Sequence, residues 1–139
     1  MTKDFLASSD FLAINKKHCH EMIETLLENN IYFYVIAGSD FITFSPKLPP
    51  ELDAMYSTQK YIIFGLYDYT FTSIKLDKNT MSFHAGFGEE NYESIVSIEL
   101  NAIKQIKINN DIIFVNNAIF TKSPKQKSIE NILKYNKLK

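Results

Sequence analysis

The sequence has no arginine, only one cysteine and no long apolar run. Without arginine the chain lacks the planar guanidinium that grips phosphates and guanine edges, which argues against a nucleic-acid surface. Cys19 has no partner for an internal disulfide, which indicates the reducing cytoplasm rather than secretion. No segment approaches the roughly 18 apolar residues of a membrane span, and Asp4 and Asp10 interrupt the stretch where a signal peptide would be apolar. We therefore expect a soluble, cytoplasmic protein.

The common catalytic and metal-binding motifs are also missing. The sequence contains no phosphate-binding loop, dinucleotide-binding glycine pattern, CxxC, HExxH or GxSxG motif. His18 and His20 flank Cys19, but residues two apart on a helix point about 200° from each other, so the two imidazoles cannot bind one ion. His84 has no second histidine nearby and fits a partly exposed strand residue better than a catalytic one. The sequence therefore predicts no enzyme, no metal site and no cofactor.

Charge divides the chain into an acidic body and a basic tail. Residues 1–120 contain nine lysines and fifteen acidic residues, whereas residues 121–139 contain six lysines and one glutamate. A chain of 139 residues with 45% apolar content fits one domain with tails. We divide it into an N-terminal arm (1–15), a domain (16–120) and a tail (121–139) that we expect to be flexible. The arm contains Ser8-Ser9-Asp10, a possible helix cap, and fits either a short helix or a loosely attached segment.

Residues 16–30 have the spacing of an amphipathic helix. The helix is predicted to end at Asn29-Asn30, because asparagine tolerates the left-handed turn at a helix C-terminus. Its stripe covers either the core of this chain or the matching helix of a partner. The apolar stripe consists of Cys19, Met22, Ile23, Leu26 and Leu27.

About seven short strands are predicted after this helix. The clearest pair, 81–87 and 92–100, is joined by the polar link 88–91, which is typical of a hairpin. The other predicted strands are 31–37, 41–45, 60–66, 69–76 and 111–115, while 101–106 is predicted as one helical turn and 47–51 as a loop. Strands without intervening helices favour a small barrel or strongly bent sheet, mainly β and α+β by helix count, over a parallel α/β fold.

The first strand of the hairpin has one apolar and one polar face, because side chains alternate along a strand. Met81, Phe83, Ala85 and Phe87 lie on the face that we expect to be buried. The link and its flank carry three glutamates, and this acidic edge is either a solvated turn or a contact site for a basic partner. The three are Glu89, Glu90 and Glu93.

Four segments also occur in a familiar order: residues 26–31 leading into a strand, a proline-bearing loop at 45–56, an apolar strand at 61–64, and the hairpin. The most specific pattern is F-x-x-x-F-G at 83–88, followed by x-L-x-A-I at 99–103. Over residues 22–116 the chain resembles the SspB family, the stringent starvation protein B adaptors of the ClpXP protease. Glu89 stands where the family usually has a second glycine, and Glu99 where it usually has a proline.

The resemblance implies an Sm-like β-barrel and a homodimer formed through the N-terminal helix, for which we assign Met22, Ile23, Leu26 and Leu27. It implies a groove that binds the ssrA degradation tag of another protein, and a tail that docks on the ClpX unfoldase. We assign the groove to Phe83, Ala85, Phe87, Gly88, Ile98 and Ala102. We assign the docking motif to Ile129, Ile132, Leu133, Tyr135 and Lys137.

Other functions remain open at this point. A basic tail also serves simply to keep a protein in solution, and a sheet with a groove does not identify its ligand. An Sm-like barrel is compatible with RNA binding, although the acidic body and the missing arginines oppose it. The aromatic content of 14% is also compatible with a pocket for a small ligand.

Overall fold

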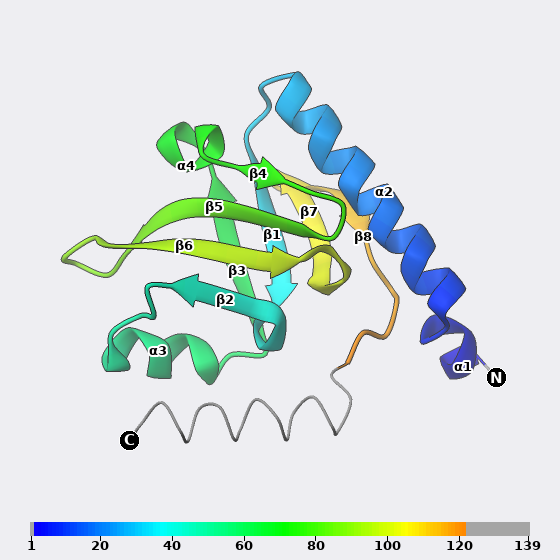
Figure 1. Cartoon of the computed structure of the whole chain (residues 1–139). Coiled ribbons are helices and arrows are strands. Elements are labelled where there is room, and N and C mark those ends of the chain that lie inside the picture. The colour runs from blue at the N-terminus through cyan, green and yellow to red at the C-terminus, as the bar shows by residue number, and fades with distance from the viewer. Residues whose placement is uncertain (1, 122–139) are drawn as a thin grey trace.

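The computed structural model describes residues 2–121 and contains two antiparallel four-stranded sheets with four helices (Figure 1). The helices are α1 (Thr2–Leu6), α2 (Ser9–Glu28), α3 (Pro50–Ser57) and α4 (Asp68–Thr72), with the 3-10 turns η1 (Ser39–Phe41) and η2 (Leu100–Ala102). The strands are β1 (Phe33–Gly38), β2 (Ile42–Ser45), β3 (Tyr61–Leu66), β4 (Lys75–Leu76), β5 (Thr80–Phe87), β6 (Tyr92–Glu99), β7 (Ile103–Ile108) and β8 (Asp111–Val115). The prediction of a small α+β domain is confirmed.

The strands do not close into a barrel, which corrects the finer prediction. One sheet has the order β3-β1-β7-β8 and the other the order β2-β6-β5-β4. The chain passes from the first sheet to the second through η1, between β1 and β2, and it returns to the first sheet through η2, between β6 and β7. Because no strand of one sheet pairs with a strand of the other within residues 2–121, the sheets pack face to face instead.

The core lies between the two sheets and follows the alternation of their strands. On β5, Met81, Phe83 and Phe87 are buried, as predicted for this face of the hairpin. Phe83 packs edge-on against Phe64 of β3, with ring centroids 5.3 Å apart. Both hairpin strands form as predicted, and they pair without interruption from Thr80↔Glu99 to Phe87↔Tyr92.

Helix α2 closes one side of this core (Figure 1). It begins at Ser9, earlier than predicted, because the Ser8 side chain accepts a hydrogen bond from Phe11 N at 3.2 Å and caps the helix. It ends as predicted in a left-handed asparagine, Asn30 (φ 55°), and Ile31 N donates to Leu26 O at 2.9 Å.

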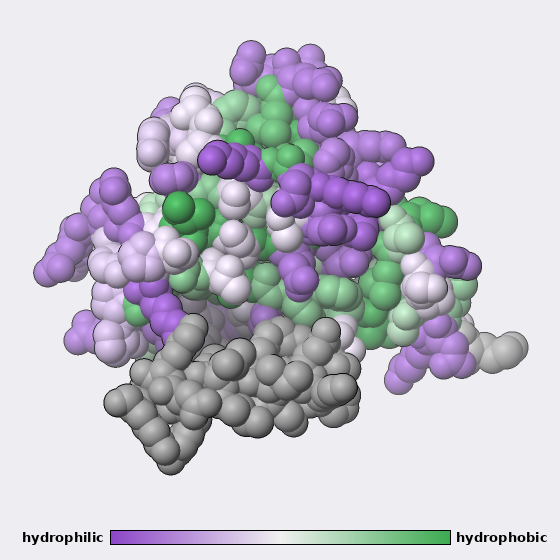
Figure 2. Space-filling view, in the orientation of Figure 1, coloured by the Kyte–Doolittle hydropathy of each residue, from purple (hydrophilic) through white to green (hydrophobic). Residues whose placement is uncertain are grey.

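The apolar stripe of α2 packs against the core of its own chain, which is one of the two alternatives left by the sequence. Cys19, Ile23 and Leu26 are buried, and Met22 and Leu27 pack partly buried against the same cluster. The face of α2 in view is mostly hydrophilic (Figure 2). The side chains assigned to a dimer interface are therefore largely occupied within one chain.

Two predicted elements are wrong for identifiable reasons. Residues 69–76 form α4 and the short β4 rather than one strand, because Ser73 Oγ and Thr72 Oγ1 donate to helical carbonyls while Phe71 anchors the turn in the core.

Residues 103–108 form β7 rather than a helical turn. A β-bulge places both Ile103 and Ile106 on the buried face, and their spacing of three imitates a helix. Helix α3 was also missed, and it begins at Pro50, where a proline suits the first turn.

Removal of the Ser8 cap tests the start of α2. The Ser8→Ala variant leaves the Phe11 amide without its side-chain acceptor, so we expect the free energy of unfolding to fall by about 1 kcal/mol. Urea denaturation measures it. Ser9→Ala, at an exposed neighbouring serine, is the matched control and should change stability by less than about 0.5 kcal/mol. Equal losses in the two variants would contradict the cap.

Cys19 makes stability depend on alkaline pH. Burial raises the pKa of this thiol from 9.0 to about 12, so above pH 9 the unfolded chain ionises while the folded chain keeps its proton. Stability should therefore fall as pH rises from 9 towards 12, with a loss of about 2 kcal/mol by pH 10.5. Urea denaturation of the protein and of Cys19→Ala at pH 8 and pH 10.5 isolates this contribution, and parallel pH dependences would contradict it.

Candidate functional site

Most residues assigned to a peptide groove are core residues. Phe83, Ile98 and Ala102 are at most 1% exposed and Phe87 is 7% exposed. Phe83, Phe87 and Ile98 belong to the core between the sheets, and Ala102 lies in η2. Ala85 is half-buried on the same face, and only Gly88 is exposed. The assigned side chains therefore do not line an open groove, and the surface available at the hairpin consists of its link and its strand edges.

The hairpin link is held by its backbone and by helix α3. Gly88 has a φ of 73°, and Asn91 N donates to Gly88 O at 3.1 Å to close the turn. Leu52 of α3 lies under Gly88, where an added β carbon would be 3.4 Å from its methyl groups. Glu89 and Glu90 are exposed beyond this support, so the acidic edge predicted from the sequence lies in solvent.

An aromatic cluster fixes the same end of the hairpin from inside. The Phe87 ring packs edge-on against Phe44 of β2 at 5.5 Å and against Tyr56 of α3 at 5.7 Å. Phe87 therefore supports the position of the link rather than offering its ring to a ligand.

One edge of the hairpin is closed. β6 pairs with β2 along its outer side, from Ile42↔Ile98 to Ser45↔Ile95. Beyond β2 the chain is fastened to β6 by side chains, because Ser94 Oγ donates to Pro46 O at 2.8 Å and Tyr92 Oη donates to Lys47 O at 3.0 Å.

The other edge of the hairpin is only partly covered. β4 pairs with β5 at two positions, Lys75↔Ser82 and Leu76↔Met81. Beyond Ser82, the only hydrogen bond that β5 makes on this side within residues 2–121 joins His84 N to Ser73 Oγ at 2.8 Å. The hairpin link projects past both β4 and α4 (Figure 1).

The direction of the His84 amide identifies which backbone groups reach this edge. In an antiparallel strand the N–H and C=O groups of one residue point to the same side, and successive residues point to opposite sides. Since His84 N points away from β6, Gly86 also directs its N–H and C=O groups outward. Gly86 is exposed, and no strand of the described residues pairs with it on that side. Tyr69 of α4, 66% exposed, lies beside this edge with its ring 6.1 Å from the His84 ring.

The remaining predicted residues lie away from this edge. His18 packs edge-on against Phe114 at 5.3 Å while Cys19 points into the core, which agrees with a packing role for the histidine-cysteine segment. Glu99 is exposed at the end of β6. The predicted docking residues Ile129, Ile132, Leu133, Tyr135 and Lys137 lie outside the described residues.

The positive φ of Gly88 predicts a specific sensitivity of the link. Gly88→Ala places a β carbon in the left-handed region, so we expect a loss of about 1–2 kcal/mol in the free energy of unfolding. Gly38→Ala is the matched control, because Gly38 has an ordinary φ of -68° and the nearest atom to its added β carbon lies 3.8 Å away. Thermal denaturation of both variants measures the difference in their stability. Equal stability of Gly88→Ala and Gly38→Ala would contradict the need for a left-handed conformation at Gly88.

Comparison with known proteins adds no relative for this chain. No protein-family model and no curated protein matches its sequence. Within residues 2–121, no helix is long and apolar enough to cross a membrane, and no three histidine, cysteine or acidic residues gather into a possible metal site.

Proposed function

We propose that this protein is a non-catalytic adaptor that binds a peptide degradation tag and delivers the tagged protein to ClpXP. The observation that carries the proposal is the free edge of β5 beyond Ser82. An extended peptide recognises such an edge by adding a strand to the sheet, with main-chain hydrogen bonds providing affinity. The resemblance of residues 22–116 to SspB adaptors provides the class of peptide, an ssrA-type tag.

In this proposal the peptide continues the line of β4 along β5. Its backbone bonds the outward N–H and C=O groups of Gly86 and the C=O group of His84, while Tyr69 and His84 contact its side chains. Gly88 gives the peptide close access past the end of the strand. Glu89 follows immediately and repels an acidic tag, so this departure from the family pattern favours tags with less negative charge at that end.

Delivery is assigned to the tail. The docking motif at 129–137 follows the described domain, and a tether of this kind raises the local concentration of the cargo near the unfoldase. Double substitution Ile132→Ala and Tyr135→Ala should abolish delivery while leaving peptide binding intact. An SspB-like homodimer is part of the proposal, and it requires a surface other than the buried Ile23 and Leu26.

Peptide binding is tested by fluorescence anisotropy of a labelled ssrA-type peptide with the full-length protein. We expect saturable binding, and we expect N-methylation of a backbone amide that bonds the edge to weaken it about tenfold. The modified peptide replaces mutation of Gly86, because the Asn91 side chain occupies the position of any β carbon there. Affinity that is indifferent to N-methylation at every position would exclude strand addition.

A pair of tyrosine variants places the peptide on the protein. Tyr69→Ala removes an exposed ring beside His84 and should cost about 1 kcal/mol of binding, roughly fivefold in Kd. Tyr67→Ala is the matched control. Tyr67 precedes Asp68 in the sequence, and its ring packs against Tyr34 of the first sheet. Equal effects of the two substitutions on Kd would place the peptide elsewhere.

A further inference from the structure

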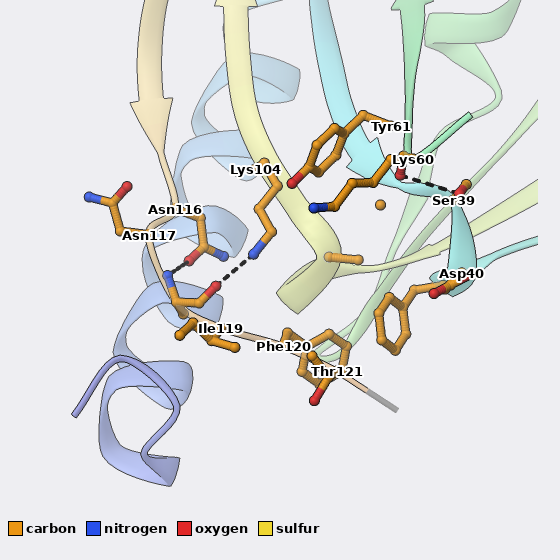
Figure 3. Close-up of a pocket in the computed structure, with 14 residues that line it drawn as sticks. Ser39, Asp40, Lys60, Tyr61, Lys104, Asn116, Asn117, Ile119, Phe120 and Thr121 are labelled. Carbon is orange, nitrogen blue, oxygen red and sulfur yellow. Dashed lines mark hydrogen bonds between the residues drawn. The ribbon is translucent and has the colours of Figure 1, made fainter. Parts of the chain in front are cut away.

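A second site is formed at the far end of the sheets from the hairpin link. A cavity of about 460 Å³ lies between the end of β1, the start of β3 and the segment after β8 (Figure 3). It is lined by both polar and apolar side chains, and it shares no residue with the free edge of β5. Its features therefore call for an explanation independent of peptide binding at the hairpin.

An irregularity in strand pairing aims a lysine at this cavity. β1 pairs with β7 at Ile36↔Gln105 and then at Ala37↔Ile103, so Lys104 is an extra residue without a partner on β1. Such a bulge redirects the side chain of the inserted residue. Lys104 consequently lines the cavity, and its Nζ donates to Ala118 O at 2.6 Å.

The position of Lys104 is held by a buried asparagine. Asn116 is 4% exposed, and its backbone N–H donates to Lys104 O at 2.8 Å. Its side chain donates to Ile103 O at 3.3 Å and accepts from Ala118 N at 2.9 Å. Asn116 therefore acts as a positioning residue that fixes both the bulge and the carbonyl that Lys104 contacts.

A second lysine enters the same space. Lys60, next to the first residue of β3, lines the cavity, and both lysine side chains project into it (Figure 3). Partial burial and the nearby Lys60 charge lower the pKa of Lys104. Neither lysine forms an ion pair with a carboxylate of residues 2–121, and Asp40 is the one acidic residue of that part in the cavity wall. Two neighbouring cations with one wall carboxylate form a site with excess positive charge.

The rest of the wall restricts what kind of anion fits. Phe41 and Phe120 stack with ring centroids 4.4 Å apart, and Ile119 and Ala102 continue this apolar surface. A small inorganic anion would leave the apolar wall and most of the volume unused. The wall and the two lysines together match a ligand that has one negative group and an apolar body.

We propose that this cavity binds an organic carboxylate joined to an apolar group, with the carboxylate between Lys60 and Lys104 and the apolar group against Phe41 and Phe120. The carboxylate is carried either by the C-terminal residue of a peptide or by a free small acid, since the two share this chemistry. Charge-assisted bonds from both ammonium groups hold the anion, and its arrival relieves their mutual repulsion.

The test is an NMR titration of the full-length, isotope-labelled protein with N-acetyl-leucyl-phenylalanine as the free acid and as its C-terminal amide. We expect the free acid to shift the amide signals of Lys60, Lys104 and Ala118 with saturation, and the amide to bind at least tenfold more weakly. 3-Phenylpropanoate and inorganic phosphate are parallel probes. Comparable binding of 3-phenylpropanoate supports a free small acid as ligand, and much weaker binding supports a peptide C-terminus.

Three lysine variants locate the anion. Lys104→Met and Lys60→Met should each raise the Kd of the free acid at least fivefold, whereas Lys17→Met, on the exposed face of α2, should leave it unchanged. Lys60 is exposed, and Lys60→Met keeps the hydrogen bond between Lys104 and Ala118. This variant therefore tests the proposal even if Lys104→Met fails to fold. Equal binding of acid and amide, binding of phosphate alone, or unchanged affinity in Lys60→Met would overturn the proposal.

Discussion

The edge-on contact between Phe83 of β5 and Phe64 of β3 is the interaction on which the rest of the structure depends. These rings join two sheets that share no strand pairing within residues 2–121, so side-chain packing holds the two faces together. The contact commits the inner face of β5 to the core, together with Met81 and Phe87. With that face buried, only the backbone edge and the outer face of the hairpin are available to a ligand.

Both proposed sites occur where strand pairing is interrupted. β4 is two residues long and leaves the outward groups of Gly86 without a strand partner in the described chain, and the bulge at Lys104 turns a lysine into a cavity. Regular ladders satisfy their own backbone groups and carry little binding potential, whereas a short edge or an inserted residue leaves groups free to bind. At the edge of β5, Tyr69 provides an exposed side chain for contact with a ligand. At the cavity, Asn116 provides a buried support for Lys104.

Sequence periodicity predicted the elements whose packing is regular. The alternation of β5 and the stripe of α2 were sufficient to place Met81, Phe83, Ile23 and Leu26 on buried faces. Periodicity failed at β7, where the bulge imitates helical spacing, and at α4, where side-chain hydrogen bonds from Thr72 and Ser73 stabilise a turn in a strand-like run. Most of the groove residues taken from the resemblance are core residues, and nothing in the sequence signals that β4 begins only at Lys75 or that Lys104 is unpaired.

Hydrogen exchange at the Gly86 amide tests the central claim, that a peptide adds a strand to the free edge of β5, most directly. In the free protein this amide points to solvent and should exchange fast, whereas the amides of Phe83 and Ala85, which point to β6, should be protected. A saturating ssrA-type peptide should slow exchange at Gly86 about tenfold or more by providing an acceptor. If the peptide binds and exchange at Gly86 stays fast, the peptide does not pair with this edge and the account of the site is wrong.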